Sequence, residues 1–376
     1  MLVPFNRPTV SPTHQVRFSQ VTTSAKWAGD GDQTREASQR LSRLHADSPV
    51  LLTTSCTAAL EMCALLLELA PDDEVIVPSF TFVSSANAFA LMGARIIFSE
   101  IDRITLGISM NTIRPLLTDR TKAVVVVNYA GIPALSATDI TELQERQIAV
   151  IEDNAHGLFG SDADGLSLGT RSDLSTLSFH ETKNISCGEG GALVINNPRF
   201  LERAEIIREK GTNRTRFFRG MVDKYTWVDK GSSYLMSEFC AAVLNSQLDF
   251  AIQIQERRRT TATYYAEQIA TTRVGLMNEE LLLRNLAPGN PNHMFYLLTS
   301  SLEQRTHLLQ HLKAHGVTGT FHYVPLHSSP AGRQFGMFHG DLEVTQEISD
   351  RIVRLPLFSD ITTAEAEQVV QSMKLF

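Results

Sequence analysis

Two residues of opposite charge, Asp153 and Lys183, have the types and spacing of a shared chemical site. Asp153 ends the apolar run Ala149–Glu152, where an unpaired carboxylate is costly to bury and needs a cationic partner. Lys183 follows the apolar run Leu174–Phe179, and partial desolvation there would make its amine a Schiff-base nucleophile. The two residues stand 30 positions apart, one strand–loop–strand unit, so both can reach one crevice. The alternatives are a helix N-cap for Asp153 and a solvated surface lysine for Lys183.

Small polar residues and an aromatic residue follow two other apolar runs. Within Thr53–Ala59 a strand is expected to pass directly into a helix, with Ser55, Cys56 and Thr57 at the helix start. Free backbone N–H groups and hydroxyls at such a start form an anion site, although a plain N-cap is the simpler alternative. Phe82 follows the next apolar run and could stack on a flat ring or fill a core.

Together these features fit pyridoxal 5′-phosphate (PLP), which has a phosphate, a flat pyridine ring and an aldehyde. The helix start would take the phosphate, and Phe82 would cover the ring. Asp153 would keep the pyridine nitrogen protonated, so that the ring withdraws electrons. Lys183 would carry the aldehyde as a Schiff base.

The elements that must position these residues repeat about every 25 residues as an apolar run followed by a segment of helical character. This alternation predicts an α/β fold with a mainly parallel sheet, whose ligand lies beyond the carboxyl ends of the strands. Helices are expected over Thr57–Leu69 and Pro198–Lys210, and residues 236–270 are also helical in pattern. The expected strands are Val50–Thr53, Glu74–Val77, Arg95–Phe98, Ala123–Val127, Ala149–Glu152, Leu174–Phe179 and Ala192–Asn196.

Length and composition limit the class of the whole molecule. The chain has 376 residues and a formal net charge of −7, which disfavours nucleic acid or anionic lipid as a general partner. At about 150 residues per domain, we expect a large PLP-binding domain over residues 1–240 and a smaller α+β domain over residues 241–376. The sequence shows no signal-peptide pattern and no apolar run close to the ~20 residues of a membrane span. Its 4 cysteines lack the spacing of zinc ligands. These features predict a cytoplasmic protein without a metal.

Five short motifs combine over most of the chain. They read S-C-T-A-A from Ser55, P-S-F-T-F from Pro78, E-D-N-A-H from Glu152, S-F-H-E-T-K from Ser178 and G-E-G-G from Gly188. In combination they resemble the DegT/DnrJ/StrS family of PLP-dependent sugar aminotransferases, which have the aspartate-aminotransferase-like fold (PLP fold type I). The resemblance extends from Pro4 to about Pro356.

The resemblance implies a role for each matched residue. Lys183 would be the lysine that bears the cofactor, and Asp153 the partner of the pyridine nitrogen. His156 would lie near the phenolic oxygen of the cofactor, and Phe82 would stack on its ring. The phosphate would be held by Ser55, Cys56, Thr57 and Ser178.

A homodimer with its active site at the subunit interface is also implied. In many relatives an Asn of the neighbouring subunit, within a G-x-N-Y-x-M segment, completes the phosphate site. This chain has Ser233 at that position, a shorter donor, so the identity of the cross-subunit contact stays open.

The activity implied is transfer of an amino group from L-glutamate to a nucleotide-linked keto-sugar. Some relatives carry His in place of the lysine and remove a hydroxyl, but Lys183 is intact. Residues 208–214, 222–227, 231–236 and 321–327 resemble more narrowly those members that act on C4 of a dTDP-4-keto-6-deoxy-hexose in enterobacterial common antigen synthesis. Their product is a dTDP-4-amino-4,6-dideoxy sugar. The alternatives are a GDP-4-keto or 3-keto sugar as acceptor, or a non-catalytic binding or regulatory protein on this fold.

A basic segment is the candidate contact for the substrate diphosphate. Residues 208–224 hold six basic and two acidic side chains, and arginine binds phosphate oxygens bidentately. Arg214 and Arg219 are the expected contacts; a solvated loop, or ion pairs across the dimer, are the alternatives. The sugar is expected to meet His322, Tyr323 and His327 from the C-terminal domain.

Overall fold

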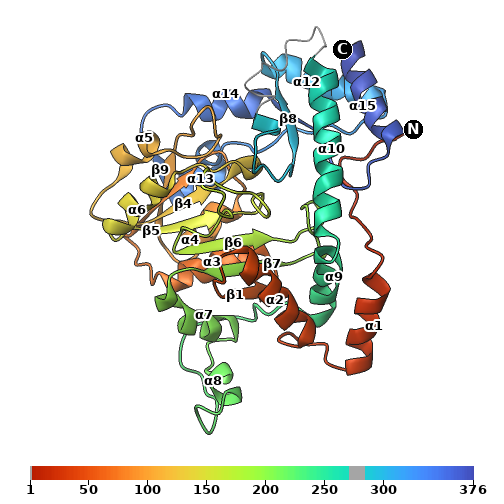
Figure 1. The fold of residues 1–376 in the computed structure, drawn as a ribbon. Coiled ribbons are helices and arrows are strands. Elements are labelled where there is room, and N and C mark those ends of the chain that lie inside the picture. The colour runs from red at the N-terminus through yellow and green to blue at the C-terminus, as the bar shows by residue number, and fades with distance from the viewer. Residues whose placement is uncertain (1, 271–283) are drawn as a thin grey trace.

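An eight-stranded sheet forms the centre of the computed structural model, which describes residues 2–270 and 284–376 (Figure 1). The strand order is β1-β7-β6-β5-β4-β2-β3-β9. Strand β7 runs antiparallel to both of its neighbours, and the other pairs are parallel. The strands are β1 (Val50–Thr53), β2 (Glu74–Pro78), β3 (Arg95–Ser99), β4 (Thr121–Val127), β5 (Ala149–Asp153), β6 (Leu174–Ser178), β7 (Gly191–Ile195) and β9 (Gly336–Phe338).

The expected mixed, mainly parallel sheet is confirmed, and each of its predicted strands is found within two residues of the expected bounds. Strand β9 was not expected. It comes from the C-terminal part of the chain and pairs in parallel with β3, from Ile96↔Gly336 to Phe98↔Phe338. The C-terminal part of the chain therefore supplies one edge of the central sheet.

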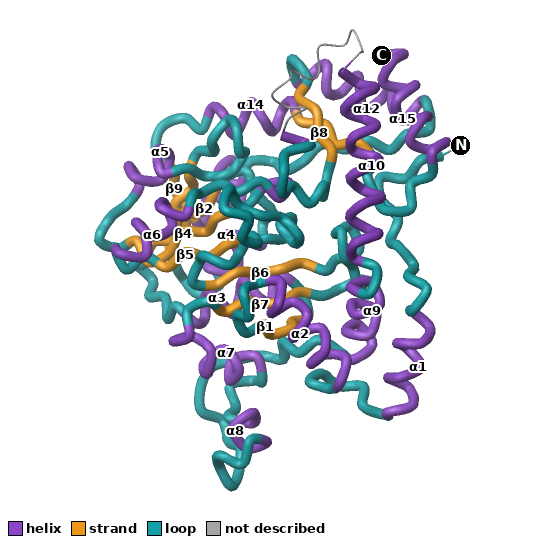
Figure 2. The backbone as a smooth tube through the Cα atoms, viewed as in Figure 1, coloured by secondary structure: helices purple, strands orange, loops and turns teal. Residues whose placement is uncertain are grey.

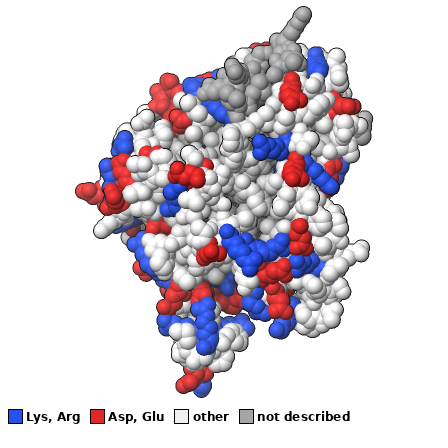
Figure 3. All heavy atoms as spheres, viewed as in Figure 1, with Lys and Arg blue, Asp and Glu red and all other residues white. Residues whose placement is uncertain are grey.

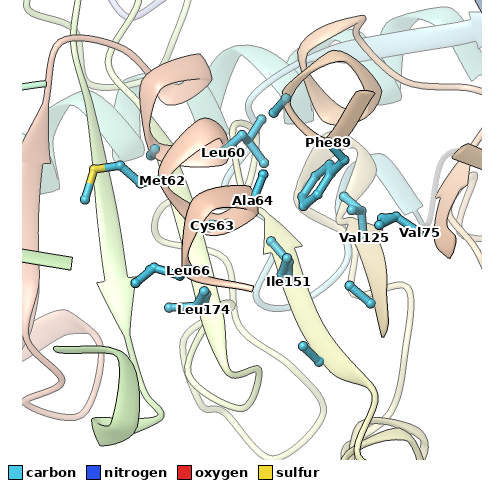
Figure 4. Packing of buried hydrophobic residues seen from close by; sticks show 14 of the residues in the cluster. Leu60, Met62, Cys63, Ala64, Leu66, Val75, Phe89, Val125, Ile151 and Leu174 are labelled. Atoms are coloured by element: carbon cyan, nitrogen blue, oxygen red, sulfur yellow. The ribbon is translucent and has the colours of Figure 1, made fainter. Parts of the chain in front are cut away.

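Both faces of the sheet are covered, which explains why the strands read as continuous apolar runs. Successive side chains point to opposite faces, so Val75 and Val77 pack under α3 and α4, whereas Ile76 packs on the other side. Figure 4 shows the first of these layers, with side chains of α3 packed over Val125 and Ile151. The helices around the sheet are α2 (Asp32–Leu44), α3 (Cys56–Leu66), α4 (Ser84–Ala90), α5 (Met110–Ile113), α6 (Ala137–Glu145), α7 (Leu201–Arg208) and α9 (Glu238–Leu248).

Two predicted helices are shorter than expected. The helix predicted over Thr57–Leu69 ends at Leu66, because the chain turns into a left-handed conformation at Glu68, with φ of 53°. The helix predicted over Pro198–Lys210 begins with a 3₁₀ turn, and its α-helical part is Leu201–Arg208.

A smaller unit lies above the carboxyl ends of the strands in the view of Figure 1. Its antiparallel strands β8 and β10 pack with three helices, α10, α12 and α15, around an apolar core that includes Val3, Tyr265, Leu308 and Val369. Its elements are α10 (Ala251–Ala270), β8 (Phe295–Leu298), α12 (Leu302–Ala314), α14 (Glu343–Arg351), β10 (Ile352–Leu355) and α15 (Thr363–Leu375), with α13 (Pro330–Phe335) beside β9.

The predicted boundary between residues 240 and 241 falls within α9, and residues 271–283 of the expected small domain lie outside the described residues. The two-domain division therefore stays a prediction. No helix in the described part of the chain has the length and apolarity needed to cross a membrane.

Candidate active site

A cavity of about 470 Å³ lies where the parallel strands end, between the sheet and the smaller unit. Its walls include residues that directly follow or end β1, β2, β5 and β6, as the strand-end rule predicts. The sequence-predicted residues that line it are Ser55, Cys56, Thr57, Phe82, Asp153, His156, Ser178, Lys183, His322 and Tyr323.

Asp153 is the last residue of β5, and its buried carboxylate faces this cavity. Its Oδ2 accepts a hydrogen bond from Ser85 Oγ at 2.7 Å, and its Oδ1 accepts from the Ala155 N–H at 3.1 Å. No basic side chain of the described residues lies within 4.0 Å of it. Among the described residues, no side chain therefore supplies the cationic partner that a buried carboxylate needs.

Lys183 lies in the loop after β6, half-buried in the wall of the same cavity. Desolvation lowers the pKa of its amine to about 8, although the nearby Cys56 and Asp153 act in the opposite direction. A lysine in water titrates near 10.4, so the site raises the fraction of neutral, nucleophilic amine at neutral pH.

Helix α3 begins at the cavity wall. Ser55 is its N-cap, and the Ser55 Oγ accepts a hydrogen bond from the Ala58 N–H at 3.0 Å. Strand β7 approaches this helix start closely, since a Cβ on Gly191 would lie 2.3 Å from the Cys56 nitrogen. Burial raises the pKa of the Cys56 thiol, which favours its neutral form. The helix start thus presents backbone N–H groups and hydroxyls, a suitable environment for a phosphate.

The aromatic wall of the cavity is built from two segments. Phe82 keeps 56% of its surface exposed, whereas Phe80 beside it in sequence is fully buried in the core. Phe82 is thus free to stack on a ligand, and its ring centroid lies 6.5 Å from that of Tyr323. The Tyr323 hydroxyl lies 3.3 Å from His156 Nε2.

Three histidines gather on one side of the cavity. The His156 ring stacks on that of His293 at 4.6 Å between centroids, and His322 Nδ1 lies 2.7 Å from the Tyr129 hydroxyl. Burial lowers the pKa of His156, His293 and His322 well below its usual value. These rings are therefore neutral donors and acceptors at physiological pH.

Four predicted site residues do not line this cavity. Arg219 is paired with Glu205 at 2.7 Å, and Arg214 lies 3.8 Å from Glu209. Both arginines belong to the segment around α8 (Arg214–Phe218), which Figures 1 and 2 show reaching away from the sheet as a mostly irregular loop. The other two are Ser233, which is exposed, and His327, whose Nδ1 lies 2.7 Å from Ser79 Oγ. Their functional roles stay predictions.

The sequence reasoning missed several cavity residues, among them His293 and Arg354. His293 stands two residues before the apolar strand β8, and Arg354 interrupts the apolar strand β10. Asp153 was identified because it is a charged residue at the end of an apolar run. The same signal, a polar or charged residue next to or within an apolar run, could have identified His293 and Arg354.

The donor set fits PLP. The buried Asp153 lacks a cation and suits a protonated pyridine nitrogen, the α3 start suits a phosphate, and Lys183 is desolvated for imine chemistry. A central sheet with this acid and this lysine at its strand ends defines a PLP-dependent enzyme of fold type I.

Comparison with known proteins supplies the family. The model of the DegT/DnrJ/EryC1/StrS aminotransferase family matches residues 9–374. The chain belongs to this family of PLP-dependent aminotransferases, and PLP is its cofactor.

Solved structures share this fold over the whole chain. The aminotransferase TlmJ from Streptoalloteichus hindustanus is 25% identical, with a TM-score of 0.89 over 100% of this chain and 98% of its own. PseC from Helicobacter pylori, an aminotransferase of pseudoaminic acid biosynthesis, is 21% identical, with a TM-score of 0.90 over 99% and 98%. The PLP form of Spr1654 from Streptococcus pneumoniae is 23% identical, with a TM-score of 0.87 over 100% and 98%.

Proposed function

We propose that this protein transfers an amino group from L-glutamate to C4 of a dTDP-4-keto-6-deoxy-hexose. The products would be a dTDP-4-amino-4,6-dideoxy sugar and 2-oxoglutarate. The observation that carries amino transfer is the meeting of Lys183 and Asp153 in one cavity. The choice of sugar nucleotide rests on the narrower sequence resemblance over residues 208–214, 222–227, 231–236 and 321–327.

Each cavity residue has a defined task in this reaction. PLP, when bound, supplies a ring that stabilises negative charge at the carbon bearing the transferred amine. Asp153 holds the proton on the ring nitrogen, and Ser85 fixes the orientation of that carboxylate. With PLP bound, Lys183 would remove the proton from Cα of the donor as a base and would then deliver it as an acid to C4′ of the cofactor. Ser55, Cys56, Thr57 and Ser178 bind the phosphate.

The proposal includes a homodimer. Ser233, Arg214 and Arg219 lie outside the cavity of their own chain, on a segment whose aromatic side chains are exposed. In a dimer this segment would bring Ser233 to the phosphate site of the second copy and the arginines to the substrate diphosphate. We also propose that the protein acts in the cytoplasm, in polysaccharide biosynthesis.

Reduction of the purified protein with borohydride tests the central assignment. We expect a yellow protein that loses its visible absorbance and carries the cofactor mass on the peptide containing Lys183. A Lys183→Ala variant should show neither the adduct nor turnover. A colourless wild-type protein whose function survives Lys183→Ala would instead indicate a non-catalytic protein on this fold.

Substrate assays test the acceptor. L-glutamate is combined with dTDP-4-keto, GDP-4-keto and 3-keto sugars, and formation of 2-oxoglutarate is followed. We expect the highest kcat/KM with the dTDP-4-keto-6-deoxy-hexose. A preference for a GDP-linked or a 3-keto sugar would replace this acceptor while leaving the chemistry at Lys183 unchanged.

A further inference from the structure

A chain of two buried hydroxyl groups ends on the carboxylate of Asp153. Thr81 Oγ1 lies 2.8 Å from Ser85 Oγ, and Ser85 Oγ lies 2.7 Å from Asp153 Oδ2. Thr81 stands in the loop after β2, and Ser85 belongs to the first turn of α4. Both residues are buried. The loop and the helix that follows it therefore converge on the end of β5.

The direction of these hydrogen bonds follows from the charge of the carboxylate. An ionised carboxylate only accepts hydrogen bonds, so the Ser85 hydroxyl donates its single proton to Asp153. Ser85 Oγ can then only accept from Thr81, whose hydroxyl is the donor. Hydrogen bonds in such a chain polarise one another. Thr81 therefore strengthens the bond between Ser85 and Asp153 without touching the carboxylate itself.

Asp153 keeps acceptor capacity for a ligand. Besides the Ser85 bond, its Oδ1 accepts from the Ala155 N–H at 3.1 Å, and Cys56 Sγ lies 4.0 Å from the same oxygen. A carboxylate has about four acceptor positions, so these contacts leave room for one more donor. Because Asp153 lines the cavity, an N–H group of a molecule bound there can use that position.

Glu238 shows how a buried carboxylate with a structural task is arranged in this fold. It accepts from the backbone N–H groups of Gly31 at 3.0 Å, Gln33 at 2.8 Å and Thr34 at 3.0 Å, and from the Thr34 hydroxyl. Glu238 thus fastens the start of α2, and it does not line the cavity. The protein fills the acceptor positions of Glu238, whereas it leaves part of those of Asp153 to the cavity.

The segment that carries the two hydroxyls also reaches other parts of the proposed cofactor position. Phe82, directly after Thr81, lines the cavity and is the expected cover of the ring. Ser84, directly before Ser85, lies with its Oγ 2.7 Å from Thr57 Oγ1 at the α3 start. Neighbouring residues of one short segment therefore contact the phosphate side and the carboxylate side of the site separately.

We propose that Thr81 and Ser85 are positioning residues that keep the proton on the ring nitrogen of bound PLP rather than on Asp153. This inference rests on the place of Asp153 opposite that nitrogen in the proposed function. Hydrogen bonds donated to a carboxylate stabilise its charged form, and the charged form stabilises a protonated ring beside it. Without the two hydroxyls the shared proton would move toward the carboxylate, and the ring would withdraw electrons less strongly.

Binding of two forms of the cofactor to the full-length, cofactor-free protein tests this proposal. PLP is compared with 1-deaza-PLP, in which a carbon replaces the ring nitrogen, and both dissociation constants are measured by fluorescence titration. The two compounds share the phosphate and the aldehyde, so the ratio of the constants reports on the ring nitrogen. For Ser85→Ala we expect the preference for PLP to fall about 10-fold, because a hydrogen bond to a charged group is lost.

Thr81 offers a matched pair of variants. Thr81→Val keeps the shape of the side chain but removes the hydroxyl, whereas Thr81→Ser keeps the hydroxyl. We expect the preference for PLP to fall roughly 3-fold in Thr81→Val, because only the polarisation of the second bond is lost. Thr81→Ser should retain the wild-type preference. Any loss of folded protein affects both titrations of a variant equally and cancels in the ratio.

The ring nitrogen can also be observed directly. In protein loaded with PLP that carries a heavy nitrogen isotope in the ring, the nitrogen resonance distinguishes a protonated from a neutral pyridine. We expect the wild-type resonance at the protonated position and a displacement toward the neutral position in Ser85→Ala. A merely structural role of Ser85 would not move this resonance.

Ser84→Ala is the neighbouring control. It removes the hydroxyl that bonds Thr57, so it should affect the binding of PLP and 1-deaza-PLP alike and leave their ratio unchanged. An unchanged ratio and an unchanged nitrogen resonance in Ser85→Ala would overturn the proposal. An equal loss of preference in Ser84→Ala would also overturn it, by assigning the effect to the packing of α4.

Failure of the proposed function gives a different pattern. If the wild-type protein binds both compounds equally, or if Asp153→Asn keeps the wild-type preference, Asp153 is not the partner of the ring nitrogen and both proposals fall. If Asp153→Asn abolishes the preference while Ser85→Ala keeps it, only the role of the hydroxyls is overturned. These titrations contain no substrate, so the identity of the sugar acceptor does not affect their outcome.

Discussion

Two neighbouring carboxylates at the end of β5 have different environments. Because side chains alternate along a strand, Asp153 faces the cavity while Glu152 points to the other side. Glu152 Oε1 accepts a hydrogen bond from Asn128 Nδ2 at 2.8 Å, and burial raises the pKa of Glu152. Glu152 can therefore serve as a control for Asp153, since it is a carboxylate on the same strand that points away from the cavity.

Asp153→Asn should lower kcat for amino transfer by on the order of 100-fold or more, since the amide keeps the shape but removes the charge opposite the ring nitrogen. Glu152→Gln should retain near-wild-type kcat. Steady-state kinetics with L-glutamate, with circular dichroism of both variants, gives the comparison. Equal losses in the two variants would mean that the charge of Asp153 has no special role.

The lowered pKa of Lys183 predicts a pH dependence in the cofactor-free protein. Below its pKa of about 8 the amine is protonated and unreactive, and above it the amine is neutral and nucleophilic. The rate at which an amine-reactive reagent labels Lys183 should therefore be half-maximal near pH 8. Mass spectrometry of the same digest gives exposed Lys26 as an internal reference. A midpoint for Lys183 above pH 10 would contradict a desolvated amine.

At the scale of the element, the N-cap of α3 has both a structural and a binding task. Ser55→Ala removes the acceptor for the Ala58 N–H and should lower the free energy of unfolding by about 1 kcal/mol. It should also weaken PLP binding, because Ser55 is one of the residues proposed to bind the phosphate. Ser301 caps α12 in the same way, because its Oγ accepts a hydrogen bond from the Gln304 N–H at 3.1 Å. Ser301 does not line the cavity.

Ser301→Ala is therefore expected to cost similar stability without changing the dissociation constant of PLP. Urea unfolding and fluorescence titration with PLP measure the two quantities. If both variants bind PLP like wild type, Ser55 is only a cap, which is the simpler alternative for this motif.

The central strands could be predicted because burial on both faces makes them continuous apolar runs, and the strand-end rule then located Asp153 and Lys183. Strand β9 could not be predicted in this way. It has three residues, and its partner β3 lies about 240 positions earlier, so only tertiary packing selects the pair. For the same reason no local pattern brings Arg354 to the cavity that Lys183 lines, since they come from different units of the fold.

At the scale of the whole molecule, charge is dispersed, and one projecting segment carries several exposed aromatic side chains. Basic and acidic side chains are intermixed over the face seen in Figure 3. In contrast, the segment between α7 and α9 projects from the body and exposes 69% of Phe218 and 78% of Trp227. A backbone hydrogen bond from the Asn213 N–H to the Thr226 carbonyl oxygen closes this projection into a defined shape.

Exposed aromatic side chains on a defined projection are typical of a protein interface. If this projection holds the proposed dimer together, the double variant Phe218→Ser, Trp227→Ser should shift the protein from dimer to monomer in analytical ultracentrifugation. Amino transfer should fall with dimer content, because Ser233 would no longer reach the second copy. Ile104→Ser removes a similarly exposed apolar side chain from another loop and should leave the dimer intact. A double variant that stays dimeric and fully active would exclude this projection as the dimer contact, whereas a wild-type protein that sediments as a monomer with full activity would remove the shared active site altogether.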